Sequence, residues 1–367
     1  MDKTYIDLMA LLAHKLFDKP TLAQINDEIV QEAKQQAVLG LVKEDDLLIA
    51  KNMKVAYGHK EIHDLLTTNN IKYTILKGLA SSHYYHSPEI RSLGDVDFLV
   101  AKEDIEKTKK ILKENGFVAC NEPGDHHFGY KHKGVGFEMH FCINGIPEGK
   151  YGEAASDYLN DILYKSQLTK ISFVSCNIPC DFHNGIIFIL HIIKHLIGGG
   201  IGLRHLCDWA VFVDSFNDFS LTFEEAFNKM GVWEFCKRLT ALCVKYLGLS
   251  EKSWIGDFDD ECLTEFIEDI LNSGNFGKKN PVPYASVLTG TRNSNIFVNG
   301  IHTMNRVIYI YFPFVKKAKG LLPVFWLWLI LRYIFRVFTG KRKMVNLKTV
   351  KYAKSKTELL AKFNLYQ

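Results

Sequence analysis

The length, composition and charge of the chain exclude several classes of protein. Its 367 residues are enough for two or three domains, and 47% hydrophobic with 23% charged residues is typical of globular rather than disordered proteins. The eight cysteines form no CxxC pair, which argues against a zinc ribbon or a disulfide framework and favours a reducing, cytoplasmic setting. The N-terminus lacks the basic, apolar and small-residue order of a signal peptide, so we expect no export.

The net charge of +4 conceals an asymmetry along the chain. Residues 270–357 contain 16 Lys and Arg but no Asp or Glu, whereas residues 1–269 contain 28 basic and 40 acidic side chains. Such a segment indicates an anionic partner, either nucleic acid or anionic lipid, and in the lipid case the protein would be peripheral to the membrane. The alternative, which the sequence leaves equally open, is that the basic tail folds back on the acidic body.

Residues 1–69 are predicted to form an N-terminal helical segment. Apolar spacing predicts helices at 3–17, 21–38 and 45–68.

Residues 70–145 are predicted to form a compact α/β unit of strand, helix, strand, helix and meander. Strands are expected at 71–76, 94–100, 117–120, 127–132 and 135–142. Helices are expected at 79–85 and 102–115. Gly78 ends the first strand at a tight turn, Gly116 closes the second helix, and Gly134 marks the last turn of the meander.

The rest of the chain is predicted to be mainly helical. A helical domain spans 146–273, with helices at 183–197, 203–216, 222–229 and 233–247. Residues 274–300, rich in Gly, Asn, Pro and Ser, form a predicted loop or linker. The fold class expected is α+β, a small mixed-sheet core flanked by an N-terminal helical segment and a mostly helical C-terminal half.

Residues 301–367 are expected to be a basic, apolar C-terminal helical region. Its segment 321–338 is very apolar, but the uncharged core is too short for a membrane span. We therefore expect no transmembrane span, and we favour a buried helix over an interfacial one.

Three carboxylates in the α/β unit indicate a metal site. Asp95 and Asp97 are two residues apart in a predicted strand, so their side chains point the same way. Like charges side by side on a partly buried strand are destabilising, and Mg²⁺ removes that penalty. Glu138 is a lone acid on an apolar strand; if the two strands are neighbours, the three acids converge on a site for two metals. The alternative is a solvent-exposed D-x-D pair, which is common.

The order of these elements resembles a known family. The motifs that carry the resemblance are Lys77-Gly78, RSLGDVDFLV at 91–100 and FEMH at 137–140. They are similar to the polymerase-β-like nucleotidyltransferase superfamily, most closely to the bacterial group called uncharacterised nucleotidyltransferases. The resemblance extends into the helical half through Leu190–His195, Leu203-Arg204 and Asp208, and covers most of residues 70–340.

The resemblance implies an enzyme that moves a nucleoside monophosphate from a magnesium-bound NTP, such as ATP, to an acceptor hydroxyl and releases pyrophosphate. The implied catalytic residues, also the ligands of a two-metal Mg²⁺ site, are Asp95, Asp97 and Glu138. The implied nucleotide contacts are Lys77, Gly78, Ser81, Ser82 and Arg91. A small molecule, a protein or an RNA end would each suit as acceptor. The family has Ser directly after the glycine, where this chain has Leu79, so the alternative is an inactive binding or scaffold protein on the same fold.

Other polar residues allow two interpretations. His191 and His195 are four apart on an apolar helix, where they are zinc ligands or, as we favour, hydrogen-bonded core histidines. Arg204 either pairs with Asp208 one turn later or faces the nucleotide. The glycine-rich stretch 198–202 follows a helix rather than a strand, which favours a turn over a phosphate loop.

Overall fold

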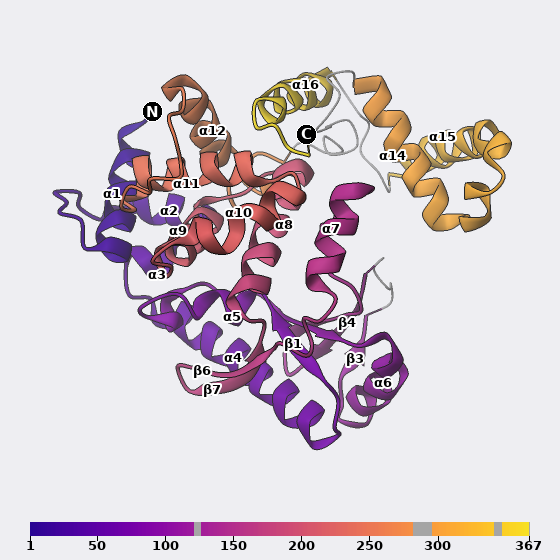
Figure 1. Ribbon diagram of the computed structural model, residues 1–367, viewed down its shortest axis with the longest axis horizontal. Helices are drawn as coiled ribbons and strands as arrows, with labels where there is room; N and C mark the ends of the chain where they lie inside the picture. Colours follow the sequence, from indigo (N-terminus) through magenta and orange to yellow (C-terminus); the bar gives the residue numbers. More distant parts are fainter. Residues whose placement is uncertain (121–125, 282–295, 341–346, 367) are drawn as a thin grey trace.

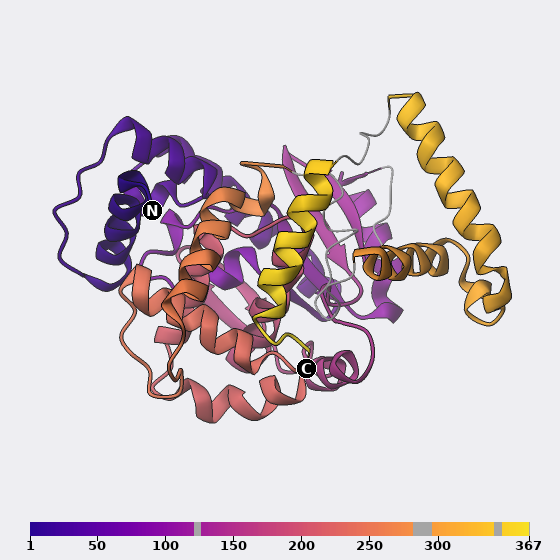
Figure 2. The same cartoon turned by 90° about the horizontal axis from the view of Figure 1, so that it is seen from above.

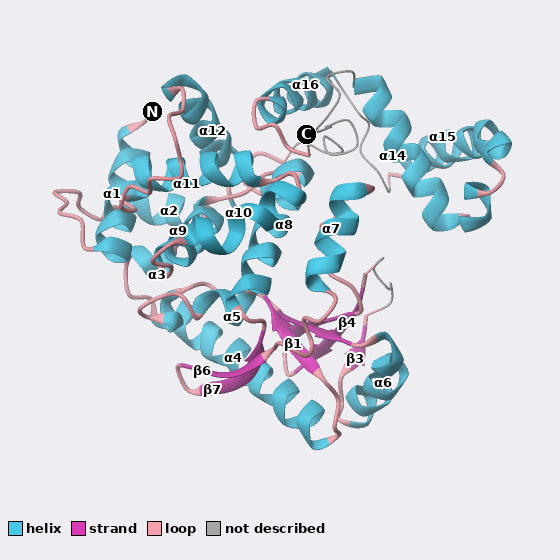
Figure 3. Cartoon of the chain, in the orientation of Figure 1, coloured by secondary structure: helices cyan, strands magenta, loops and turns pink. Residues whose placement is uncertain are grey.

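The computed structural model describes residues 1–120, 126–281, 296–340 and 347–366. Figure 1 shows a mixed sheet on one side, a helical body on the other, and a helical hairpin that extends from the body. The predicted α+β class is confirmed, and Figure 3 shows how strongly helix predominates outside the sheet.

The main sheet has the strand order β1-β2-β5-β4-β3. Its strands are β1 (Tyr73–Leu76), β2 (Val96–Val100), β3 (Val118–Ala119), β4 (His127–His132) and β5 (Val135–His140). Strand β2 runs parallel to β5, and the other neighbours are antiparallel. Gly134, at φ 73°, makes the tight turn from β4 to β5, because glycine adopts this conformation without a steric penalty. The parallel pair sets Asp97 opposite Glu138, the neighbour relation on which the predicted metal site depends.

The elements that cover the sheet include segments that precede its first strand in the chain and segments that follow its last strand. These are α4 (Asp46–Thr68), α5 (Gly78–Ser82), α6 (Ile105–Glu114) and a hairpin of β6 (Gln167–Ile171) and β7 (Val174–Ile178). Ile62 of α4 and Val174 of β7 are buried in the same core as Phe98 and Phe137 of the sheet. The packed unit around the sheet therefore extends beyond residues 70–145 in both directions.

A second core unites the remaining helices of the body. They are α1 (Lys3–Phe17), α2 (Asp27–Gln35), α3 (Leu39–Val42), α7 (Lys150–Leu159), α8 (Asp181–Gly198), α9 (Leu203–Asp214), α10 (Phe219–Lys229), α11 (Trp233–Leu247) and α12 (Asp260–Ser273). Trp209 is fully buried in it and donates a 2.9 Å hydrogen bond to Thr240, which satisfies its indole N–H. Short 3₁₀ turns lie at Pro88–Ile90, Lys102–Asp104, Asn275–Gly277, Pro313–Lys316 and Lys319–Leu321. All eight cysteines lie in the described ranges and are free thiols.

The C-terminal region leaves the body and then returns to it. Helices α14 (Ile296–Tyr311) and α15 (Leu322–Phe338) form the projecting hairpin, while α16 (Leu347–Ala361) lies back on the body (Figure 2). Phe363, just after α16, packs against Phe235 and Phe266. Helix α15 has no buried residue, so the interpretation of 321–338 as a buried helix is wrong. A buried core helix and an exposed helix that binds a partner can have the same apolar composition. They differ in whether other elements of the chain pack against them, which composition does not show.

Candidate active site

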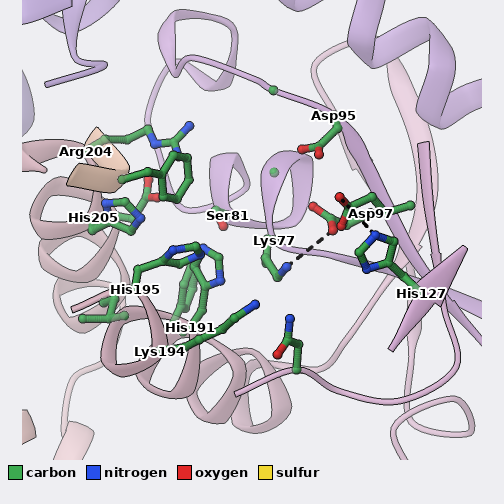
Figure 4. Close-up of a pocket in the computed structure, with 18 of the residues that line it drawn as sticks. Lys77, Ser81, Asp95, Asp97, His127, His191, Lys194, His195, Arg204 and His205 are labelled. Carbon is green, nitrogen blue, oxygen red and sulfur yellow. Dashed lines mark hydrogen bonds and ion pairs between the residues drawn. The ribbon is translucent and has the colours of Figure 1, made fainter. Parts of the chain in front are cut away.

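A pocket of about 330 Å³ lies between the sheet and the helical body. Figure 4 shows acids from the sheet on one side of it and basic and histidine side chains from α8 and α9 on the other. The polar side chains that line it are Lys77, Ser81, Arg91, Asp95, Asp97, His126, His127, Glu138, Asn144, His191, Lys194, His195, Arg204, His205 and Asp208. The two packing units thus each supply one wall of the same cavity.

The three predicted acids lie together in this pocket. Asp97 on β2 faces Glu138 on β5, and their carboxylates lie with a nitrogen of His140 in a group whose ligand atoms are all within 4.8 Å of one another. Asp95 lies just before β2 and lines the same cavity. The alternative of a solvent-exposed D-x-D pair therefore does not describe this site, since Asp97 is only 7% exposed.

Asp97 is held as a carboxylate by two basic partners. Lys77 Nζ lies 3.4 Å from Asp97 Oδ1, the contact dashed in Figure 4, and His140 Nε2 lies 2.7 Å from the same oxygen. Burial opposes ionisation of Asp97, but these partners outweigh it and hold the pKa of Asp97 well below its usual range. Burial likewise opposes the charged form of His140, yet hydrogen bonds to Asp97 and Glu138 raise its pKa.

Asp95 has no comparable partner. Burial, followed by the negative charges of Asp97 and Glu138, raises the pKa of Asp95 to about 6. This is the physical sign of negative charge that the protein alone does not neutralise. Carboxylate oxygens are the ligands that Mg²⁺ prefers, so this donor set fits a divalent cation.

The turn between β1 and α5 brings Lys77 into the pocket. Lys77 adopts φ 53°, a conformation that residues with a Cβ rarely take, and Gly78 follows with φ 43°. Strain of this kind costs about 1–3 kcal/mol and persists where the surroundings impose it, often at functional sites. The result is that the Lys77 amine reaches Asp97 from the end of the neighbouring strand.

The predicted nucleotide contacts are not all in the pocket. Lys77, Gly78, Ser81 and Arg91 line it. Ser82 is fully buried and donates its hydroxyl to the carbonyl of Leu79 at 2.7 Å, so it lies outside the lining.

Arg91 is engaged by a buried ion pair. Its Nε and Nη2 donate to the two oxygens of Asp208 at 2.7 and 2.6 Å, and the Tyr85 hydroxyl donates to the same carboxylate at 2.7 Å. This bidentate pair connects the turn before β2 to helix α9 across the seam between the two walls. Asp208 is therefore not the partner of Arg204, and the predicted i, i+4 pair is replaced by a longer-range one.

Arg204 faces the pocket, as the second interpretation required. Its guanidinium lies 5.0 Å from the ring of Phe276 and donates weakly to the carbonyl of Ser92 at 3.4 Å. Its buried Nε has no partner among the described residues. Burial lowers the pKa of Arg204 to about 10, which leaves it charged at neutral pH, and burial also lowers the pKa of Lys194. This wall consequently offers positive charge that the described protein atoms leave largely uncompensated.

His191 and His195 of α8 line the pocket rather than the core. His191 and His195 are partly exposed on its wall, and burial keeps both neutral by lowering their pKa, to about 3 for His195. Two groups among the described residues could hold a metal, Asp97-Glu138-His140 and His126-His127-His140, and the α8 pair belongs to neither. The interpretation as core histidines missed a signal, because His191, Lys194 and His195 repeat at three and four residues and so share one helix face.

Comparison with known proteins identifies the family of the chain. The family described as uncharacterised nucleotidyltransferase matches residues 8–248, about two thirds of the chain. None of the curated proteins matches the sequence.

Solved structures give weaker likenesses. One is an antigenic nucleotidyltransferase-like protein from Paracoccidioides brasiliensis, 14% identical with a TM-score of 0.37, covering 55% of this chain and 94% of that one. Another is the antibiotic-resistance factor ANT(2'')-Ia, 14% identical with a TM-score of 0.35, covering 53% and 96%. The match over residues 8–248 takes in both walls of the pocket, and by it the chain belongs to the uncharacterised nucleotidyltransferase family.

Proposed function

We propose that the protein transfers a nucleoside monophosphate from a magnesium-bound NTP to an acceptor hydroxyl. The observation that carries this proposal is that three acids on the sheet wall of the pocket face two cations on its helical wall. The acids are Asp95, Asp97 and Glu138, and the cations are Lys194 of α8 and Arg204 of α9. A triphosphate requires both kinds of group, because its oxygens bind cationic side chains while its metal binds carboxylates.

The side chains would divide the work as follows. Asp95, Asp97 and Glu138 would hold Mg²⁺, which when bound supplies positive charge next to the reacting phosphate. Lys194 and Arg204 would bind phosphate oxygens, and the guanidinium of Arg204 has donors to spare for this.

In the reaction, the acceptor oxygen forms a bond to the α-phosphorus while the bond to the bridging oxygen breaks and pyrophosphate leaves with that electron pair. Glu138 would take the proton of the acceptor hydroxyl. Its side chain is 32% exposed against 9% for Asp97, and neutral His127 lies 3.6 Å from it as a further acceptor.

A second candidate is a binding or scaffold protein without transferase activity. It is favoured by Leu79 in place of the family's serine and by the contacts of Asp97 with both Lys77 and His140. Such a protein would keep the fold while its carboxylates no longer served a cation.

Metal-dependent nucleotide binding separates the two candidates. We expect ATP, CTP, GTP or UTP to raise the melting temperature only when Mg²⁺ is present, because a ligand that binds the folded state alone stabilises it. Glu138→Gln should lose this shift. Glu61→Gln is a matched control, since Glu61 has a similar exposure, 28% against 32%, and lines a different cavity. The enzyme proposal fails if none of the four nucleotides gives a magnesium-dependent shift, or if Glu138→Gln keeps the wild-type shift.

A further inference from the structure

Helix α15 carries a continuous apolar surface that no other part of the described chain covers. Five of its exposed side chains repeat at three- and four-residue intervals and so form one stripe along the helix. This apolar stripe consists of Val324, Leu327, Leu331, Phe335 and Phe338. It contains no charged residue, and none of α15 is buried against the body. A patch of this kind on a soluble surface marks a site of contact with a partner.

The opposite side of α15 faces α14. Phe325 and Trp328 pack against Phe312 at 4.5 and 5.1 Å between ring centroids, and Trp326 donates to Asn305 at 2.8 Å. The hairpin is thus held by its own contacts, and the apolar stripe is the face left over. Figures 1 and 2 both show α15 at the periphery of the molecule, away from the helical body.

Positive charge lies at the N-terminal end of the stripe and along one of its sides. Lys316, Lys317 and Lys319 are exposed at the bend of the hairpin, and Arg332 and Arg336 flank the stripe on α15 itself. Arg332 lies 5.1 Å from the ring of Trp328, a pairing that places a cation at the edge of the apolar face. None of the ion pairs found in the described ranges involves these five residues.

The two ends of the basic segment behave differently from the hairpin. Lys279 pairs with Glu32 at 2.7 Å, and Lys356 pairs with Asp269, so both are neutralised by the acidic body. Folding back on the body therefore accounts for the ends of residues 270–357. It does not account for the hairpin, whose positive charge is left for an external partner.

We propose that α15 binds the surface of an anionic lipid bilayer, with the apolar stripe in the headgroup region and the basic residues against lipid phosphates. An uncharged apolar face bordered by Lys, Arg and Trp is the composition of interfacial helices. Nucleic acid would match the charge but would leave the apolar stripe in water. A second copy of the chain would cover the stripe but would bring the same positive charges together.

The path of the chain favours a helix that lies on the bilayer over one that crosses it. By length and composition Lys319–Phe338 could span a membrane, and it is the one such helix in the described ranges. Crossing would carry α16 to the far side, yet the chain after α16 packs onto the body through Phe363. Both ends of the hairpin therefore stay on the same side. The α-helical part, at 17 residues, is also only about 25 Å long, short of the roughly 30 Å hydrocarbon core.

Co-sedimentation with vesicles tests the proposal on the full chain. We expect binding to vesicles of phosphatidylcholine mixed with phosphatidylglycerol, much weaker binding to pure phosphatidylcholine, and loss of binding as salt is raised. The double variant Leu331→Asp, Phe335→Asp should weaken binding more than about tenfold, because it puts two charges into the stripe. Lys316→Glu should weaken it about fivefold or more.

Matched controls exclude general effects of the substitutions. Leu221→Asp adds a charge at a side chain that is 86% exposed on α10, and Lys110→Glu reverses an exposed charge on α6; both should bind like wild type. Leu331 and Phe335 are 57% and 65% exposed, so the double variant should melt like the wild type.

Three results would overturn the proposal. The first is equal sedimentation of wild type and double variant. The second is equal binding to neutral and anionic vesicles. The third is an oligomer that the double variant converts to a monomer, without vesicle binding by either. Pyrophosphate release is measured separately, so failure of this inference and failure of the proposed function are distinguishable.

Discussion

Asp95→Asn should stabilise the metal-free protein while removing its response to magnesium. The pKa of Asp95 is raised from 3.8 to about 6 by burial and by the charges of Asp97 and Glu138. A shift of about two units corresponds to about 3 kcal/mol of folding free energy that ionised Asp95 takes from the native state. The neutral amide removes this term, and for a chain of 367 residues each kcal/mol is worth roughly 1.3 °C, so a gain of about 4 °C is expected.

The pH dependence of the melting temperature tests independently whether ionised Asp95 destabilises the folded protein. Because the folded pKa is raised, the destabilisation is fully present above pH 6 and disappears as the pH falls from about 6 towards 3.8, where Asp95 takes up its proton in both states. The melting temperatures of wild type and variant, measured in chelator, should therefore differ most above pH 6 and converge near pH 4. With Mg²⁺ added above pH 6, the wild type should rise and the variant should respond little, because it lacks one ligand.

The control is Asp157→Asn, which removes the same charge from an exposed position on α7. It should leave both the melting temperature and the magnesium response near those of the wild type. A variant at Asp95 that melts no higher than the wild type in chelator, or a gap that stays constant from above pH 6 down to pH 4, would refute the account of Asp95 as uncompensated negative charge.

Three other substitutions test neighbouring parts of the site. Asp97→Asn should abolish pyrophosphate release and, unlike Asp95→Asn, lower the melting temperature, because Lys77 and His140 lose their buried partner; a more stable variant would contradict the ion pair. Asp208→Asn should destabilise by about 3–5 kcal/mol in denaturant titration, since it leaves buried Arg91 unpaired, and a loss below about 1 kcal/mol would contradict this. Arg204→Gln should weaken magnesium-dependent NTP binding at least about tenfold without lowering the melting temperature, and unchanged binding would show that the guanidinium does not meet phosphate.

Much of the α/β unit could be predicted because its sequence signals are local. Alternation and Gly134 define the last hairpin, and β4 spans His127–His132 as predicted. The sequence predicted that Asp97 and Glu138 converge only if their two strands are neighbours, because no local signal determines which strands pair. Parallel pairing of β2 with β5 is a long-range choice made by the whole sheet.

The predictions that were wrong or missing concern a pocket-facing side of a helix, a β-hairpin and a long-range ion pair, none of which the apolar spacing of one segment reveals. An apolar helix such as α8 can bury most of its surface and still present His191 and Lys194 to a cavity. The hairpin β6–β7 was missed because its first strand is largely exposed and its turn uses Ser172 at φ 50° rather than a glycine. Arg91 finds Asp208 more than a hundred residues away, a partner that helical spacing cannot indicate.

The seam between the two packing units is what makes the pocket a single site. The acids belong to the sheet unit and the uncompensated cations of the opposite wall to α8 and α9, so the proposed binding of a metal-bound triphosphate requires both units. The Arg91–Asp208 pair, supported by Tyr85, is the buried polar contact that fixes their separation. Burying this ion pair costs much desolvation free energy, so its net contribution to stability is small. We infer that its role is to hold the two packing units at a defined distance from each other. A substitution there should consequently weaken nucleotide binding as well as stability, even though three of the five N–H donors of Arg91 are already bound by Asp208 and the Ser92 carbonyl.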